Sequence, residues 1–293
     1  MRRILNSVRG FLTPEKINRQ DEFRAQLNEN LIHQQCIGLL PDVTNGEKEG
    51  TGTASLIPGR VKVDKSTIPN SNFGVFARRD IRKGEVACLY PGEFHPRLPL
   101  WTVASPDGVP CVPFMPIKQQ YEDNCYVVHL RHCSGYLDGN PTLASVSAAG
   151  LLNPAAVGQL INHPPRGTEP NVAPFDFMWS KALQDQGQIM GQGQERHRLL
   201  GAFCARLPNV MGTGPWFLEP RAASAGTGGT AGGETFTTHT LEEHFGSPEE
   251  VLQVLPGFAF IARVDIEAGA ELFFDYELEP RARPDWYHVP TYK

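Results

Sequence analysis

Residues 268–276 read AGAELFFDY and residues 159–163 read QLINH, and these two stretches decide the fold of the chain. Each stretch alone is weak evidence, because dipeptides such as Asn-His and Asp-Tyr are common. Three further motifs precede both stretches: NFGVFA at 72–77, YPG at 90–92 and YLDG at 136–139. A fixed order of motifs across so long a span is far more specific than any single match.

The composition is that of a globular protein, and it argues against two classes. Of the 293 residues, 40% are hydrophobic and 20% are charged, and the formal net charge is −5. A nucleic-acid-coating protein carries a basic face, which this balance does not suggest. No apolar run reaches the roughly 18 residues that a membrane span needs. We therefore expect neither direct nucleic-acid binding nor membrane insertion.

The six cysteines lack the C-x-x-C spacing of zinc knuckles and redox sites. This usage predicts reduced thiols in an intracellular protein, in the nucleus or the cytoplasm. The first 20 residues are basic, and their hydrophobic residues fall at helical spacing. Such a start is typical of an ordinary surface helix, but an Arg-rich amphipathic start is also typical of a mitochondrial presequence, so the mitochondrion remains open.

Changes in composition and periodicity predict an extension, a linker and one domain that carries two insertions. The segment rich in Gly, Ala, Ser and Thr cannot bury apolar surface, which predicts disorder there. The predicted parts are a helical N-terminal extension (1–45), a linker (46–71), the domain (72–289), its insertions (93–125 and 178–256) and the disordered segment (221–233).

Short apolar, β-branched or aromatic runs between Gly and Pro residues predict strands within the domain. The predicted strands are Phe73–Ala77, Glu85–Tyr90, Tyr126–Leu130, Phe258–Ala262 and Glu271–Asp275. Asn153-Pro154 places a capping residue before a first-turn proline, which predicts a helix over Ala155–Ile161. A capping box at 247–250 predicts a second helix over Glu249–Leu255. The fold class expected is α+β and rich in β-structure.

The ordered motifs resemble those of the SET-domain protein lysine methyltransferases over about residues 72–177 and 257–289. That family carries G-x-G, Y-x-G, N-H-S-C-x-P-N and E-L-x-x-D-Y in series. Residues 153–159 (NPAAVGQ) bring the chain closest to the small, solitary SET proteins. The resemblance implies short sheets closed by a C-terminal pseudoknot, S-adenosylmethionine bound on one face, and a protein substrate whose lysine enters from the opposite face.

The resemblance also implies which residues contact the cofactor. Asn72 stands where the family has its first glycine, and asparagine tolerates positive φ better than most residues, so the turn can survive. Taken alone, Gly74 also fits an ordinary turn, and Asn162 also fits a helix C-cap. The expected cofactor-binding residues are Asn72, Phe73, Gly74, Tyr90, Asn162 and His163, of which Tyr90 also fits a structural role.

Tyr276 is the expected catalytic residue. A free lysine has a pKa of about 10.4, so the amine must lose a proton before it attacks a methyl group. A phenol can orient that amine, and alignment supplies much of the acceleration. Phe274, Trp286 and Tyr287 would line the substrate channel, and Phe274 is compatible with dimethyl or trimethyl products. A tyrosine that caps an edge strand and a terminal aromatic patch on the core remain the alternatives.

Two features leave a second interpretation open. Asn72 departs from the family motif, and residues 164–169 enlarge the loop between His163 and Pro170. A catalytically weak or inactive SET scaffold that binds protein partners is therefore the alternative to an enzyme. The acidic 234–256 segment could attract basic substrates, or it could be an ordinary solvated surface.

No metal site is expected. No cysteine follows Cys204, so the family's C-terminal zinc clip cannot form. Cys125, His129 and Cys133 would share one face of a strand with poor tetrahedral geometry. We expect a monomer.

Overall fold

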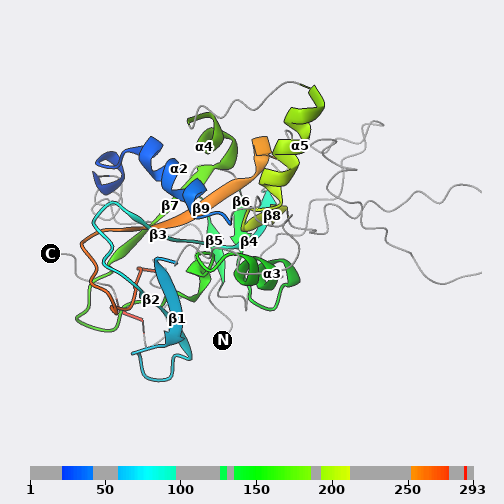
Figure 1. The fold of residues 1–293 in the computed structure, drawn as a ribbon. Coiled ribbons are helices and arrows are strands. Elements are labelled where there is room, and N and C mark those ends of the chain that lie inside the picture. The colour runs from blue at the N-terminus through cyan, green and yellow to red at the C-terminus, as the bar shows by residue number, and fades with distance from the viewer. Residues whose placement is uncertain are drawn as a thin grey trace, which may run out of the picture.

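The computed structural model describes residues 22–41, 59–96, 126–130, 135–185, 193–211, 252–276 and 287–288. These residues form three small sheets and several helices around one hydrophobic core (Figure 1). The fold is α+β and rich in short strands, as the sequence predicts. No helix in this described part of the chain is long and apolar enough to cross a membrane.

The central sheet has the order β3-β9-β7 and is antiparallel throughout. Its strands are β3 (Val86–Leu89), β9 (Pro256–Ala262) and β7 (Val172–Met178). All seven residues of β9 are buried, which explains why its sequence, PGFAFIA, is a continuous apolar run rather than an alternating one. Each fully buried Phe or Ile here contributes about 2 kcal/mol to the free energy of unfolding.

The structure has two further sheets. The first pairs β1 (Val61–Lys65) with β2 (Phe73–Ala77), so a strand lies within the segment expected to be a linker. The second has the order β5-β6-β4-β8. Its strands are β5 (Val127–His129), β6 (Gly135–Asp138), β4 (Gly92–Pro96) and β8 (Asn209–Met211). Because β8 pairs with β4, part of the expected 178–256 insertion belongs to the domain itself.

The described helices are α2 (Glu29–Gly38), α3 (Ala144–Leu152), α4 (Trp179–Asp185) and α5 (Gly193–Cys204), with a 3-10 turn η3 (Gly158–Leu160). Asn28 caps α2 by accepting a hydrogen bond from the Leu31 N–H. The helix buries Ile32, His33 and Cys36 and packs against α4 and β3 (Figure 1). Part of the predicted N-terminal extension is therefore built into the domain.

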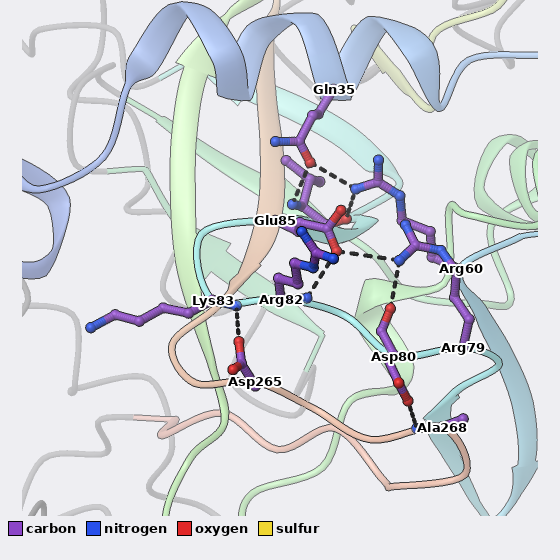
Figure 2. A network of polar contacts seen from close by, with 10 residues as sticks. Gln35, Arg60, Arg79, Asp80, Arg82, Lys83, Glu85, Asp265 and Ala268 are labelled. Carbon is purple, nitrogen blue, oxygen red and sulfur yellow. Dashed lines mark hydrogen bonds and ion pairs between the residues drawn. The ribbon is translucent and has the colours of Figure 1, made fainter.

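Figure 2 shows how polar contacts fasten α2 to the sheet. Gln35 Oε1 accepts hydrogen bonds from the Val86 N–H (3.0 Å) and from Arg60 Nη1 (2.8 Å). The same guanidinium nitrogen donates to the Val86 carbonyl at 2.5 Å. Burial lowers the pKa of Arg60, an effect that the nearby Glu85 carboxylate opposes. One glutamine side chain thus connects the helix, β3 and the residue that precedes β1.

Figure 2 also shows two hydrogen bonds that join the turn before β3 to the turn after β9. Asp80 Oδ1 accepts from the Ala268 N–H at 2.9 Å, and Asp265 Oδ1 accepts from the Lys83 N–H at 2.8 Å. These bonds are reciprocal, because each turn supplies one carboxylate and one backbone donor. They fix where the C-terminal stretch 271–276 begins its path through the molecule.

Two predicted elements are wrong in detail, and both errors have the same cause. Residues 155–161 do not form the expected helix, because the Ala155 carbonyl accepts from the Leu89 N–H (2.8 Å) and so bonds to β3 instead. Only η3 remains there, while α3 lies before the capping asparagine. Residues 271–275 form two isolated bridges with different partners rather than a strand. In both places, contacts distant in sequence override local preference.

Other predictions agree with the structure where it describes them. β2 has the predicted bounds, and β3 and β5 lie within their predicted ranges. Residues 252–254 are helical, inside the range predicted for the second helix, whereas 249–251 lie outside the described residues. The predicted disorder at 221–233 and most of the 93–125 insertion also lie outside them.

Candidate functional site

The C-terminal stretch 271–276 runs between two other parts of the chain. On one side, the Leu272 N–H donates to the Val75 carbonyl at 2.7 Å. On the other side, the Phe274 N–H donates to the Asn162 carbonyl at 3.1 Å. This threading brings the motifs at 72–77, 159–163 and 268–276 together, as the expected pseudoknot requires.

Asn171 fastens the threaded stretch, a role that the sequence reasoning missed. Its Nδ2 donates to the Glu271 carbonyl (2.8 Å), and its Oδ1 accepts from the Phe273 N–H (2.8 Å). Its own N–H donates to the Phe273 carbonyl at 3.1 Å. The available signal was Pro170-Asn171, which stands where the family's N-H-S-C-x-P-N motif ends, because such an amide can satisfy two backbone groups at once.

Tyr276 lies at the end of this stretch and is partly buried. Its hydroxyl donates to the Ile161 carbonyl at 3.0 Å. Its ring centre lies 4.8 Å from that of Phe274 and 5.5 Å from that of His163. Since the hydroxyl donates to a backbone carbonyl, its oxygen lone pairs are directed elsewhere and can accept a hydrogen bond.

His163 connects Tyr276 to the C-terminal tail. The Tyr276 N–H donates to His163 Nδ1 at 3.4 Å, which leaves Nε2 to donate to the His288 carbonyl at 2.9 Å. The Tyr287 ring stacks on the imidazole at 4.3 Å, and its hydroxyl donates to Asp275 Oδ1 at 2.7 Å. Tyr287, expected in the substrate channel, is thus held against the residue that precedes Tyr276.

The Asn162 side chain lies at the junction of three segments. Its Nδ2 donates to the Phe73 carbonyl at 2.9 Å and lies 3.2 Å from both Glu271 Oε1 and Ser66 Oγ. Two residues expected at the cofactor, Phe73 and Asn162, are therefore in direct contact. We call Phe73, Gly74, Asn162 and Glu271 the Asn162 corner.

Gly74 is required by close packing within the Asn162 corner. A Cβ at this position would lie 2.1 Å from Glu271 Oε1 and 3.3 Å from Asn162 Nδ2. Phe73 beside it is 60% exposed, so an aromatic face is open at the corner. Asn72 does not need the tolerance of asparagine for positive φ: among the described residues other than glycine, Asn70 alone has positive φ, at 67°.

Tyr90 lies deeper in the core, only 2% exposed. Its hydroxyl donates to the Tyr126 carbonyl, and a Cβ at Gly139 would lie 2.6 Å from its ring. Its ring centre is 6.3 Å from that of Phe260, which is 4.8 Å from that of Phe274. Tyr90 therefore reaches the Tyr276 region through a row of packed rings, and its cofactor contact stays a prediction.

Two further predictions concern residues at the edge of the site. Trp286 lies outside the described residues. The enlarged loop 164–169 forms a largely exposed turn, closed by a bond from the Thr168 N–H to the Pro165 carbonyl at 2.9 Å. Within the described residues, no group of three or more His, Cys, Asp or Glu side chains could hold a metal ion.

Comparison of the sequence with known protein families covers the segments described above. Residues 72–277, more than half of the chain, match the SET domain. The chain is similar to the Chaetomium thermophilum polycomb repressive complex 2, at 16% identity and a TM-score of 0.31, over 74% of this chain and 15% of that chain. It is also similar to ctPRC2 in an autoinhibited conformation bound to S-adenosylmethionine, at 16% identity and a TM-score of 0.32. That match covers 76% of this chain and 16% of that chain.

The chain spans about one sixth of the length of those structures' chains. No curated protein matches the sequence. The matched residues include the Asn162 corner, His163 and Tyr276, which the fold brings together.

Proposed function

Because the chain belongs to the SET-domain family, whose methyltransferases use S-adenosylmethionine, we propose that it is an S-adenosylmethionine-dependent protein-lysine N-methyltransferase. The observation that carries the proposal is the position of Tyr276. Its hydroxyl donates to the Ile161 carbonyl at 3.0 Å, and its ring contacts the rings of Phe274 and His163.

The residues of the Asn162 corner fit the family's cofactor. Both N–H groups of the Asn162 amide point toward protein acceptors, and no described residue donates to Asn162 Oδ1. A carbonyl oxygen of this kind suits the ammonium group of an amino acid. The exposed Phe73 ring offers an apolar face beside it. The cofactor would supply a methyl group carried on a sulfonium.

The chain's own residues would prepare the substrate. The Tyr276 oxygen can accept a hydrogen bond from a lysine amine and so fix its direction of attack. The Phe274 and Tyr276 rings, with centres 4.8 Å apart, would exclude water from that amine. Removal of water disfavours the ammonium form, which lowers the pKa of the lysine toward the neutral form that attacks.

The finer parts of the proposal rest on sequence. Residues 153–159 favour the branch of small, solitary SET proteins such as SET domain-containing protein 9. Phe274 in place of a hydroxyl-bearing residue favours dimethyl or trimethyl products. The substrate would be a lysine-bearing protein other than a histone, or one not yet defined, and the chain would act as a monomer. The net charge of −5 favours action on protein rather than on nucleic acid. The thiol usage favours an intracellular location.

The test measures transfer of a labelled methyl group from S-adenosylmethionine to protein lysines by the purified chain. We expect Tyr276→Phe to lower transfer by about 100-fold or more, because positioned groups at the reacting atoms contribute on this scale. S-adenosylhomocysteine should still bind to the variant with nearly unchanged affinity. Tyr136→Phe is the matched control, since its phenol lies on β6 outside the site, and it should retain activity.

Two results would contradict the proposal in different ways. Equal transfer by the wild-type chain and Tyr276→Phe would remove Tyr276 from catalysis. Absence of S-adenosylhomocysteine binding by the wild-type chain at millimolar ligand would leave the non-enzymatic scaffold as the better description.

A further inference from the structure

Glu271 is the buried acidic residue of the Asn162 corner, and no function has been assigned to its side chain above. The residue is 6% exposed. Its carboxylate accepts hydrogen bonds from Ser66 Oγ (2.7 Å), from the Thr67 N–H (2.8 Å) and from Thr67 Oγ1 (2.5 Å). Asn162 Nδ2 is a fourth donor, at 3.2 Å. A carboxylate so surrounded by donors has a fixed orientation.

This arrangement sets the direction of the Asn162 amide. Nδ2 faces two strong acceptors, the Glu271 carboxylate and the Phe73 carbonyl at 2.9 Å. A flipped amide would turn its own oxygen toward both of them and would lose both hydrogen bonds. An amide flip would therefore set the Asn162 oxygen against the Glu271 carboxylate and the Phe73 carbonyl, which disfavours the flipped orientation. Oδ1 must face away from Glu271.

We infer that Glu271 is a positioning residue that holds Asn162 with its carbonyl oxygen toward the amino-acid part of the cofactor. This inference rests on the proposed function. Glu271 acts through Asn162 and does not itself touch the ligand. The consequence is selectivity: the corner should favour adenosyl ligands that carry an amino-acid ammonium over those that lack it.

The contacts also explain why this role belongs to Glu271 in particular. Its carboxylate oxygen occupies the space where Gly74 would carry a Cβ, at 2.1 Å. Ser66 and Thr67, which precede β2, supply the donors that hold it. The Glu271 carboxylate thus contacts the loop at 66–67, Gly74 and Asn162 at the same time. The Asn162 amide is therefore fixed only when all three are in place.

The experiment compares two ligands that differ in the amino-acid part. S-adenosylhomocysteine carries the amino-acid part, and 5′-methylthioadenosine lacks it. NMR titration can follow both ligands, because it measures dissociation constants as weak as millimolar. In Glu271→Gln we expect the affinity for S-adenosylhomocysteine to fall about 10-fold, as a charge-assisted hydrogen bond is lost. The affinity for 5′-methylthioadenosine should change by less than about twofold.

Glu267→Gln is the matched control, because the same change is made on an exposed residue four positions earlier, and neither affinity should change. Thr67→Val provides a second variant if Glu271→Gln folds poorly. It removes one donor to the carboxylate but keeps the charge, so we expect a loss of about threefold, confined to S-adenosylhomocysteine. The Asn162 side-chain NH₂ signals in the ¹⁵N spectrum should shift in Glu271→Gln without any ligand.

The outcomes separate this inference from the proposed function. Equal losses for both ligands would make Glu271 a purely structural anchor and would overturn the inference alone. Unchanged affinities in Glu271→Gln would also overturn it. If the wild-type chain bound neither ligand, the proposed function would fail, and the inference would fail with it.

Discussion

Two regions of this domain join distant parts of the chain, and they do so by different means. The Asn162 corner is held by short polar contacts among small groups, such as an amide, two hydroxyls and one carboxylate. We call the second region the helix-docking face; it consists of Arg24, His33 and Gln35 with their partners. There, long side chains reach from the N-terminal helical segment to the domain.

The helix-docking face uses charge and aromatic packing. Arg24 donates to both the side chain (3.1 Å) and the backbone (2.9 Å) of Asp176, and its guanidinium lies 4.3 Å from the ring centre of Phe175. His33 Nδ1 lies 2.6 Å from Asp185 Oδ2. Long side chains can adjust when one partner changes, whereas Gly74 and Glu271 of the Asn162 corner leave no space between them. Substitutions in the Asn162 corner should therefore destabilise the fold more than substitutions at the helix-docking face.

The largest effect should come from Gly74→Ala in the Asn162 corner. The new Cβ would lie 2.1 Å from Glu271 Oε1, and that carboxylate is held by several donors, so it cannot move cheaply. We expect the free energy of unfolding to fall by about 3 kcal/mol. Urea unfolding followed by circular dichroism measures this loss.

Gly38→Ala is the control for that change. Gly38 ends α2, and no atom lies within 4 Å of a Cβ placed there. The substitution should leave stability unchanged or raise it by about 0.5–1 kcal/mol through helix propensity. A Gly74→Ala chain as stable as the wild type would show that the corner is looser than its distances indicate, and the contrast between the two regions would disappear.

Arg24→Ala tests the helix-docking face and should have the next largest effect. The change removes a guanidinium from Asp176, whose side chain is only 4% exposed, and it removes the cation–π contact with Phe175. We expect a loss of about 2 kcal/mol, less than the cost of breaking a fully buried pair because Arg24 is partly exposed. Thermal unfolding at pH 7 measures it.

Lys181→Ala is the matched control, because it breaks an exposed ion pair between α4 and α2. Lys181 Nζ lies 2.7 Å from Glu29 Oε2, but both side chains are well exposed. Such a pair contributes less than about 1 kcal/mol. Equal losses for Arg24→Ala and Lys181→Ala would mean that burial of Asp176 does not matter at this face.

The sequence motifs name residues of the Asn162 corner, whereas no motif names a residue of the helix-docking face. Phe73, Gly74 and Asn162 were named from their motifs as cofactor-binding residues, and that role stays a prediction. The fold shows that these three residues lie together. Glu271 and Asn171 also lie within the motifs, but their side-chain roles depend on partners 100 or more residues away.

The helix-docking face left no comparable signal. Arg24 and Asp176 are separated by 152 residues, as are His33 and Asp185, and single charged residues on a helix resemble those of any solvated surface. The prediction of a helical N-terminal segment was correct for α2, yet nothing in its sequence showed that it would pack against β3 and α4. Long-range pairing of this kind is set by the fold as a whole.

The smallest predicted effect is a pH dependence at the edge of the helix-docking face. Burial acts to raise the pKa of Glu85, but the Arg82 N–H and the Arg79 guanidinium outweigh it, so this pKa lies below its ordinary value of 4.5. A depressed carboxyl pKa contributes stability that is present above about pH 4.5 and is lost as the pH falls through the folded-state value.

Glu85→Gln should therefore lower the free energy of unfolding by about 1 kcal/mol at pH 7, and this difference should shrink as the pH approaches 3. Urea unfolding of both chains across this range measures the difference. A difference that stayed constant with pH would mean that the charge of Glu85 does not stabilise the turn next to Gln35.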